Sequence, residues 1–329
     1  MFDRRTLIKG GLAATALGAM PLRAHETVVK APFPIYDTHA HFYTNQPDKY
    51  PFQATHSRYG AEHMIAKAMA NPMTPEAVFK FWDDAGILMG TGVQYNSAYS
   101  TDNSYLLDVA AEHPARILSV VILDPLDAAT PDKLRTMTRE NKITGVRFMG
   151  MPRDGDYVFF SDAARPAWEA ASELGIVVVL MPFGGDANFA MGRVHEFATR
   201  YPNVNLVLDH MGFPNPKEHP ETFGFTPMHH ALAAHKNVFY KHTTFLMIEQ
   251  IDKSGVKLSD FMDYAVGLYG PNQFVWGSDI GNSEEDDLAY LQKAVDATAH
   301  MPYATRRAIF FDTAYKLFVP GGGSPVHSI

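Results

Sequence analysis

The chain contains no cysteine among its 329 residues. This absence excludes a disulfide scaffold, a thiol nucleophile, a cysteine-ligated zinc site and iron–sulfur chemistry. Beyond residue 25, no apolar run reaches the roughly 20 residues of a membrane span. Positive charge is in deficit, and the net charge of −8 argues against a broad nucleic-acid-binding surface. With 46% hydrophobic residues, the composition is that of a soluble, enzyme-sized globular protein.

The N-terminus has the pattern of an export signal rather than of a packed helix. A twin-arginine pair, Arg4 and Arg5, precedes an uncharged Gly- and Ala-rich stretch at 10–20 and a small residue, Ala24, at the expected cleavage point. This pattern resembles bacterial twin-arginine (Tat) signals. We therefore expect residues 1–24 to be a Tat-type signal peptide that the Tat machinery recognises, and the mature protein to be periplasmic.

The remaining chain alternates short apolar runs with amphipathic segments about eight times. The expected strands are Pro34–His39, Gly86–Gln94, Ile117–Leu123, Gly145–Met149, Ile176–Met181, Val204–Leu208, Val238–Lys241 and Phe274–Trp276. Such alternation indicates parallel strands with right-handed crossovers, and about eight units suit a TIM barrel. A doubly wound open sheet is the competing layout, but no Rossmann glycine fingerprint follows the first strand. We predict an α/β fold in which residues 25–329 form one (β/α)8 TIM barrel, with a C-terminal helix and a short Gly-rich tail.

Polar side chains stand at the ends of three expected strands. His39 and His41 end the first strand and, two residues apart, should face the same side. His210 follows the sixth strand and Asp279 the eighth, so a closed barrel would gather all four around one cavity at its carboxyl-terminal face. Three imidazoles and a carboxylate form a ligand set for Zn²⁺ or a similar ion with an open position. Asp209 should face away from His210 and is interpreted as a supporting residue.

These residues lie within four motifs, which are Asp37-Thr38-His39-Ala40-His41, Gly145-Val146-Arg147-Phe148, Leu208-Asp209-His210-Met211-Gly212 and Gly277-Ser278-Asp279. Together they resemble the amidohydrolase superfamily, and specifically its amidohydrolase-2 branch, in order across residues 33–318. Within the branch the chain is most similar to the pyrone-dicarboxylate lactonase and sulfomuconolactone hydrolase group. The resemblance implies a barrel that directs activated water at a lactone or related carbonyl. It also implies that the two histidines of the first motif, His210 and Asp279 are the catalytic residues and metal ligands.

The sequence departs from the superfamily pattern at three positions. The fifth strand ends without the further metal-ligand His of many members, and Arg147 occupies the place of the carboxylated Lys of binuclear members. The resemblance therefore implies at most one divalent ion, with Zn²⁺ the first expectation, and the lactonase group also includes metal-free enzymes. Phe213 stands where dicarboxylate lactonases carry an Arg, which argues against the same dicarboxylate as substrate.

Five further side chains are candidates for contacts with the substrate, namely Arg147, Lys241, Arg153, Tyr95 and Tyr43. A guanidinium can hold a carboxylate or sulfonate in a bidentate manner, and an ammonium acts as a point charge. For Arg147 the alternative is a structural ion pair with Asp37 or Asp279. For Arg153, in a loop, the alternative is solvation, and the two tyrosines are alternatively packing residues.

The leading expectation is a hydrolase that opens a small acidic lactone after Asp279 takes a proton from water. A bound divalent ion would assist the attack, and without one the three histidines would stabilise the oxyanion. The alternatives are a decarboxylase, hydratase or lactone isomerase that uses the same residues, or a periplasmic binding protein that has lost catalysis. The expected partners are a small acidic substrate and the Tat machinery, without nucleic acid, and a homo-oligomer is compatible with the sequence.

Overall fold

The computed structural model describes residue 29 and residues 31–57 and 59–321. The predicted signal peptide and most of the Gly-rich tail lie outside these residues, so the Tat signal and the periplasmic location stay predictions. Eight parallel strands form one sheet in chain order. They are β1 (Ile35–Ala40), β2 (Ile87–Val93), β3 (Ile117–Ile122), β4 (Gly145–Gly150), β5 (Val177–Pro182), β6 (Leu206–Leu208), β7 (Val238–Thr243) and β8 (Phe274–Gly277). The predicted TIM barrel is confirmed, and each strand lies within two residues of its expected bounds.

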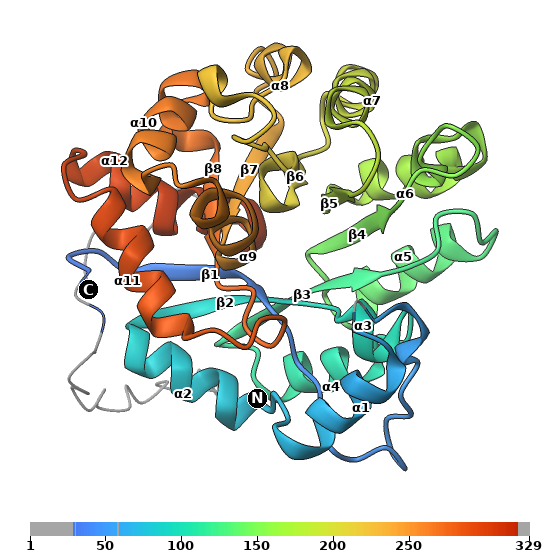
Figure 1. Ribbon diagram of the computed structural model, residues 1–329. Coiled ribbons are helices and arrows are strands. Elements are labelled where there is room, and N and C mark those ends of the chain that lie inside the picture. The colour runs from blue at the N-terminus through green and yellow to red at the C-terminus, as the bar shows by residue number, and fades with distance from the viewer. Residues whose placement is uncertain (1–28, 30, 58, 322–329) are drawn as a thin grey trace, which may run out of the picture.

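Helices surround the strands on the outside of the barrel (Figure 1). They are α1 (Ala61–Ala70), α2 (Pro75–Ala85), α3 (Asn96–Tyr99), α4 (Ser104–Glu112), α5 (Thr130–Glu140), α6 (Arg165–Leu174), α7 (Ala187–Arg200), α8 (Pro227–Leu232), α9 (Thr244–Leu246), α10 (Leu258–Tyr269), α11 (Asp287–Ala297), α12 (Tyr303–Arg307) and α13 (Thr313–Phe318). Two π-helical stretches, η6 (Met247–Asp252) and η8 (Ala308–Asp312), follow α9 and α12, and the short 3-10 turns are η1 (Ala54–His56), η2 (Val158–Phe160), η3 (Asp162–Ala164), η4 (Asp209–Gly212), η5 (Pro220–Thr222) and η7 (Pro271–Gln273). None of the helices in the described ranges is long and apolar enough to cross a membrane.

Helix α2 illustrates how local sequence signals build the outer layer. Pro75 opens the helix, where its fixed φ suits the first turn, and Gly86 ends it in the left-handed region with φ 71°. The helix buries Val78, Phe81 and Trp82 at the spacing of one helical face. This face packs on the barrel and brings the Trp82 indole to the first strand.

The barrel interior is filled by a separate apolar cluster. Alternation along the strands sends one set of side chains inward, and this cluster includes Tyr36, Val93, Val120, Val177, Val179, Val207 and Val275. The C-terminal helical segment packs against it, because Phe311, Ala314 and Phe318 belong to the same cluster. The polar residues of the site lie beyond this cluster, at the carboxyl-terminal ends of the strands.

The buried carboxylate of Asp37 joins β8 to β1. Its Oδ1 accepts hydrogen bonds from the backbone amides of His39 and Ser278, each at 2.9 Å. Its Oδ2 accepts from Ser278 Oγ at 2.6 Å and from Trp82 Nε1 at 3.0 Å. Four donors satisfy a charge that would otherwise be costly to bury. A parallel bridge between Ala40 and Ile280 continues the contact and brings the ends of β1 and β8 together.

Strand β7 places the ionisable residue His242 on the outer face of the barrel, where the helices pack. Tyr240 and His242 point outward, because Lys241 between them points into the barrel. His242 is 1% exposed, and neither of its ring nitrogens has a hydrogen-bond partner among the described residues. Burial lowers the pKa of His242 to about 4.

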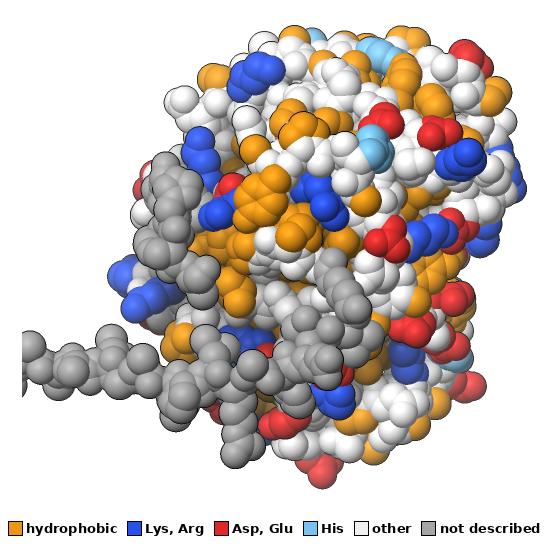
Figure 2. Space-filling view, turned by 90° about the vertical axis from the view of Figure 1, so that its left-hand side faces the viewer, with side chains coloured by type: hydrophobic (Ala, Val, Ile, Leu, Met, Phe, Trp, Pro, Cys, Tyr) orange, Lys and Arg blue, Asp and Glu red, His pale blue; other side chains and the backbone are white. Residues whose placement is uncertain are grey.

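The surface carries both signs of charge. Figure 2 shows the left-hand side of the molecule of Figure 1, and on this face Lys and Arg side chains are interspersed with Asp and Glu. Single-sign patches that attract nucleic acid do not dominate this face. The expected absence of nucleic-acid binding stays a prediction.

We predict that Gly277→Ala destabilises the protein, because a Cβ at residue 277 would lie 2.7 Å from His39 Cβ and 3.2 Å from its backbone nitrogen. Overpacking of this kind costs roughly 1–3 kcal/mol. The matched control is Gly267→Ala in α10, where nothing lies within 4 Å of the added methyl and helix propensity favours Ala by about 1 kcal/mol. Urea midpoints should move in opposite directions, and an unchanged midpoint for Gly277→Ala would contradict this account.

We also predict that His242→Leu leaves the protein as stable as the wild type at neutral pH, or more so, because Leu removes two unpartnered polar atoms. The folded-state pKa of about 4 lies below the unfolded value of roughly 6.5. The unfolded state therefore binds more protons between these values, and the wild type loses stability as the pH falls from 6.5 towards 4. Urea titrations across this interval should show a shallower loss for the variant. An equal slope would show that His242 does not contribute.

Candidate active site

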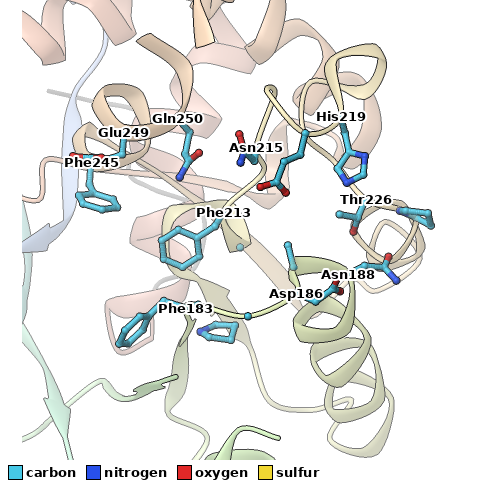
Figure 3. A pocket seen from close by; sticks show the side chains of 17 residues that line it. Phe183, Asp186, Asn188, Phe213, Asn215, His219, Thr226, Phe245, Glu249 and Gln250 are labelled. Atoms are coloured by element: carbon cyan, nitrogen blue, oxygen red, sulfur yellow. The ribbon is translucent and has the colours of Figure 1, made fainter. Parts of the chain in front are cut away.

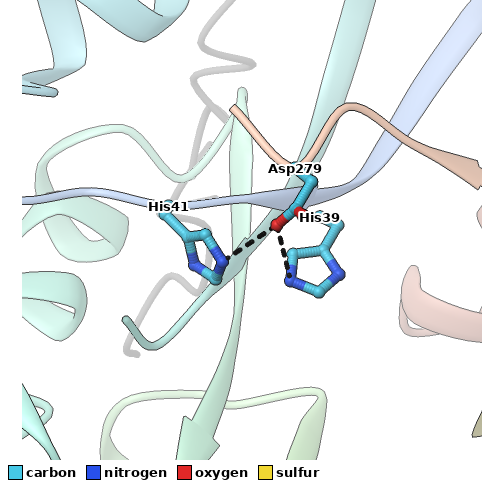
Figure 4. A group of neighbouring side chains, drawn as sticks. All are labelled: His39, His41 and Asp279. Atoms are coloured by element: carbon cyan, nitrogen blue, oxygen red, sulfur yellow. Dashed lines mark ion pairs between the residues drawn. The ribbon is translucent and has the colours of Figure 1, made fainter. Parts of the chain in front are cut away.

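The predicted residues at the ends of β1 and β8 meet at one point. Asp279 Oδ1 lies 3.2 Å from His41 Nε2 and 3.5 Å from His39 Nε2 (Figure 4). His210 lies beside them, with its ring centroid 5.9 Å from that of His39. All four side chains are buried. The structure therefore brings together the four residues that the motifs indicated.

Unusual backbone conformations aim two of these side chains. Asp279 has φ 58°, and His210 and Met211 have φ 52° and 54°. These values lie in the left-handed region, which costs residues other than glycine roughly 1–3 kcal/mol each. Strand β6 ends at Leu208, and the turn η4 that follows returns His210 to the cavity. The expectation that Asp209 faces away from the site is wrong, because the same turn lets both side chains point inward.

Asp209 is the centre of a buried ion network. Its Oδ2 accepts from Arg147 Nε at 2.7 Å, and its Oδ1 lies 2.8 Å from Lys241 Nζ and 3.5 Å from His39 Nδ1. Burial by itself would raise the pKa of Asp209, but the positive charges of Lys241 and Arg147 hold it well below its ordinary range. The structural ion pair considered for Arg147 thus exists, but its partner is Asp209 rather than Asp37 or Asp279.

The central carboxylate is charged and two of its imidazole neighbours are neutral. Burial lowers the pKa of His39 to about 3 and that of His210 to about 4. For Asp279, burial opposes ionisation, but the imidazoles around it, His39 foremost, hold its pKa below its ordinary value. Near neutral pH the site therefore offers an ionised carboxylate that can accept a proton.

Asn282 was not predicted from the sequence, although it orients Asp279. Asn282 Nδ2 donates to Asp279 Oδ2 at 3.0 Å, and its own Oδ1 accepts from the Tyr95 hydroxyl at 3.2 Å. Tyr95 also stacks on His41 with 4.4 Å between ring centroids. Tyr43 stacks on Tyr95 and donates to a backbone carbonyl of the β8 loop. The sequence signal that could have indicated this role is the position of Asn282, three residues after Asp279, where a tight turn can bring the amide back to the carboxylate.

A cavity of about 360 Å³ opens above His41, His210 and Asp279, whereas the fully buried His39 lies beneath them and is not among its lining residues. Its polar lining includes His41, Tyr95, Arg147, His210, Asp279 and Asn282, and its apolar lining includes Met149, Met181, Phe183, Phe213 and Phe245. Arg147 also lines a neighbouring cavity of about 710 Å³, where the exposed loop residue Arg153 lies. Lys241 is fully buried and lines none of the three cavities described here. The structure thus places Lys241 below these cavities, and its contact with substrate stays a prediction.

A third cavity, of about 720 Å³, adjoins the site on the other side. Figure 3 shows Phe183, Phe213 and Phe245 at one end of it, and Asn215, His219 and Asn188 among the polar side chains further along. The three phenylalanines also line the central cavity. Apart from them, the side chains that line the third cavity are mainly polar. The central chamber is thus flanked by an arginine-bearing cavity and by one rich in amides and carboxylates.

The donor set suits one divalent cation. His39, His41 and Asp279 each offer one ligand atom, and these atoms lie within 4.8 Å of one another. His41 Nδ1 lies 2.8 Å from the Val93 carbonyl, which can only accept, so a neutral His41 presents the bare Nε2 to the Asp279 carboxylate. Either a proton on Nε2 or a bound cation satisfies the Asp279 carboxylate at this point, and a carbonyl on the remote ring nitrogen is the usual support of a metal-bound His. His210 lies outside this group of three.

Comparison with known proteins agrees with this geometry. The sequence profile of the amidohydrolase family Amidohydro_2 matches residues 36–319. The L-fucono-1,5-lactonase of Burkholderia ambifaria is 26% identical over 224 residues, which are 63% of this chain and 73% of that protein.

Two of the solved structures that share the fold show its range of reactions. The putative 2-pyrone-4,6-dicarboxylic acid hydrolase of Pseudomonas putida has a TM-score of 0.68 at 22% identity, and the match covers 88% of this chain and 98% of that one. The 5-carboxyvanillate decarboxylase of Novosphingobium aromaticivorans, complexed with manganese, has a TM-score of 0.61 at 12% identity and covers 87% and 96%. The similarity to pyrone-dicarboxylate lactonases predicted from the motifs is thereby confirmed. With a family profile that spans nearly all of its described residues, the chain belongs to the amidohydrolase family.

Proposed function

We propose that the protein hydrolyses a small acidic lactone by attack of a water molecule that Asp279 deprotonates. The observation that carries this proposal is the ionised, buried Asp279 at the floor of a cavity that Arg147 also lines. One group is suited to activate water and the other to bind an acid. The similarity to a lactonase and to a pyrone-dicarboxylic acid hydrolase supports the same class of reaction.

The chemistry follows from the positions of the side chains. Asp279 Oδ1 accepts a proton from water while Asn282 holds Oδ2, and the resulting hydroxide attacks the ester carbonyl carbon. A ring N–H of His210, which lines the cavity, stabilises the oxyanion of the tetrahedral intermediate. The bond between this carbon and the ring oxygen then breaks, and Asp279 returns its proton to the departing alkoxide. The product is the ring-opened hydroxy acid.

His39, His41 and Asp279 would hold a divalent cation, with His210 beside it, and Zn²⁺ suits such imidazole and carboxylate donors. When bound, the ion lowers the pKa of water and polarises the carbonyl. Asn282 would still orient Asp279 and the apolar walls would still exclude bulk water, whereas a ligating histidine nitrogen would offer a lone pair and no longer donate an N–H.

The acid group of the substrate would bind on the Arg147 side. Asp209 accepts from the Nε of Arg147 and Met181 Sδ accepts from its Nη2 at 2.9 Å, so a ligand in the central cavity would bind the remaining N–H groups of the guanidinium. Arg153 adds a second, solvent-exposed positive charge in the adjoining cavity. The amides of the opposite cavity offer hydrogen bonds to further polar substituents.

The structural similarity to a decarboxylase makes loss of CO₂ the second candidate reaction. A panel of acidic lactones and aromatic acids in ¹⁸O-labelled water separates the two. Hydrolysis incorporates one ¹⁸O atom into the product carboxylate without gas release, whereas decarboxylation releases CO₂ and leaves the product unlabelled. Saturable binding without turnover would instead indicate a binding protein, and isomerisation would leave the mass of the substrate unchanged.

We predict that Asp279→Asn lowers kcat on any lactone that the wild type hydrolyses by at least about 10³-fold, because the general base is lost. The same change at the exposed Asp260 of α10 serves as control and should leave kcat unaltered. Circular dichroism should show that both variants remain folded. Turnover of Asp279→Asn within tenfold of the wild type would exclude the mechanism.

We predict that Arg153→Gln raises KM for an acidic lactone by roughly three- to tenfold, as expected for a partly screened ion pair, and leaves KM for a neutral lactone unchanged. Arg153 suits this test because its exposed side chain has no role in the buried Asp209 network. Arg139→Gln, on α5, controls for the change in net charge. Equal effects on the acidic and neutral lactones would show that Arg153 does not bind the acid group.

A further inference from the structure

Lys241 lies beneath the active site in contact with His39. Its Nζ is 3.3 Å from His39 Nδ1 and 2.8 Å from Asp209 Oδ1, and all three side chains are fully buried. Since Lys241 lines none of the cavities, its contacts indicate a task that is performed through His39.

The contact determines which ring nitrogen of His39 carries the proton. Asp209 faces Arg147 with one oxygen and Lys241 with the other. Burial lowers the pKa of Lys241, but the charge of Asp209 2.8 Å away opposes this shift and favours the ammonium. An ammonium can only donate, and at 3.3 Å it favours a bare, accepting Nδ1 over the Nδ1–H that could donate to Asp209 Oδ1 at 3.5 Å. A neutral imidazole that accepts at Nδ1 carries its proton on Nε2. The two tautomers contain the same number of protons, so this choice requires no change of ionisation.

The two histidines of the His-x-His pair therefore carry their ring protons on different nitrogens. His41 has its proton on Nδ1, which faces the Val93 carbonyl, and presents a bare Nε2. His39 presents Nε2–H, which points towards Asp279 Oδ1 at 3.5 Å and has no other partner among the described residues. One ring offers a lone pair to the reaction site and the other offers a hydrogen-bond donor.

We propose that Lys241 is a positioning residue that keeps His39 in the Nε2–H tautomer, which makes His39 a hydrogen-bond donor to the Asp279 carboxylate and a poor metal ligand. The role of this donor in catalysis rests on the proposed lactone hydrolysis, whereas the tautomer and its effect on metal binding do not. In the absence of Lys241, Asp209 Oδ1 becomes the acceptor for an Nδ1–H of His39. That is the carboxylate–histidine arrangement that supports metal ligation.

The tautomer can be measured directly on the wild-type, metal-free protein. ¹⁵N-histidine labelling with long-range ¹H–¹⁵N correlation distinguishes a protonated ring nitrogen from a bare one, and His39→Gln identifies the His39 signals. We expect Nε2 of His39 to be protonated and Nδ1 bare, with the opposite arrangement at His41. A protonated Nδ1 on His39 in the wild type would overturn the proposal without any variant of Lys241.

Zinc affinity gives the second test. Lys241→Met cannot donate and should bind Zn²⁺ roughly tenfold or more tightly than the wild type in competition with a chromophoric chelator, while Lys241→Arg should stay near the wild type. Arg147→Met removes the other cation of the Asp209 network without touching His39, and it should change Zn²⁺ affinity much less. Equal gains for Lys241→Met and Arg147→Met would mean that loss of charge alone accounts for the effect, which contradicts the proposal.

Both measurements use the protein without substrate. A failure to find lactone turnover would therefore disprove the proposed function and leave the tautomer result standing. Conversely, a wrong tautomer would leave lactone hydrolysis by Asp279 intact.

Discussion

The active site is built over one fully buried carboxylate. Asp209 would be costly to bury alone, and each of its oxygens is met by a cation from a different strand, Arg147 from β4 and Lys241 from β7. Loss of either partner would leave a buried charge without compensation, which typically costs several kcal/mol. Because His39 of β1 lies against the same network, four strands are held in register at the floor of the cavity. The positions of the reactive groups depend on this ion network.

A second buried carboxylate holds the other half of the site. Asp37 joins β1 to the loop after β8 through four hydrogen bonds, and this loop contains Asp279 in its left-handed conformation. The strained left-handed backbone conformations of Asp279 and His210 persist because the contacts around each turn hold it in place. Side chains that strand alternation alone would not bring together can therefore converge above a rigid floor.

Charge and proton placement distinguish residues of similar chemistry. Asp209 neutralises two cations below the cavity, whereas Asp279 faces imidazoles and can act on water. His39 and His41 lie only two residues apart, yet a lysine faces the remote nitrogen of one and a carbonyl that of the other. Within the amidohydrolase family this chain thus has a donor set of suitable geometry for a metal, while its proton arrangement favours hydrogen bonding at one of the three ligands.

The sequence by itself determined the strands, the barrel and the identity of the four central residues, because apolar periodicity and strand-end motifs are local properties. The inward orientation of Asp209 was not predictable, since the period-two rule ends with β6 and a left-handed turn redirects the chain at His210. The sequence also did not show that Arg147 pairs with Asp209, that Lys241 is buried, or that Asn282 donates a hydrogen bond to Asp279. Closure of the barrel brings together β1, β4, β6, β7 and β8 from across the chain, and only that long-range packing decides which charges meet and which face the cavity.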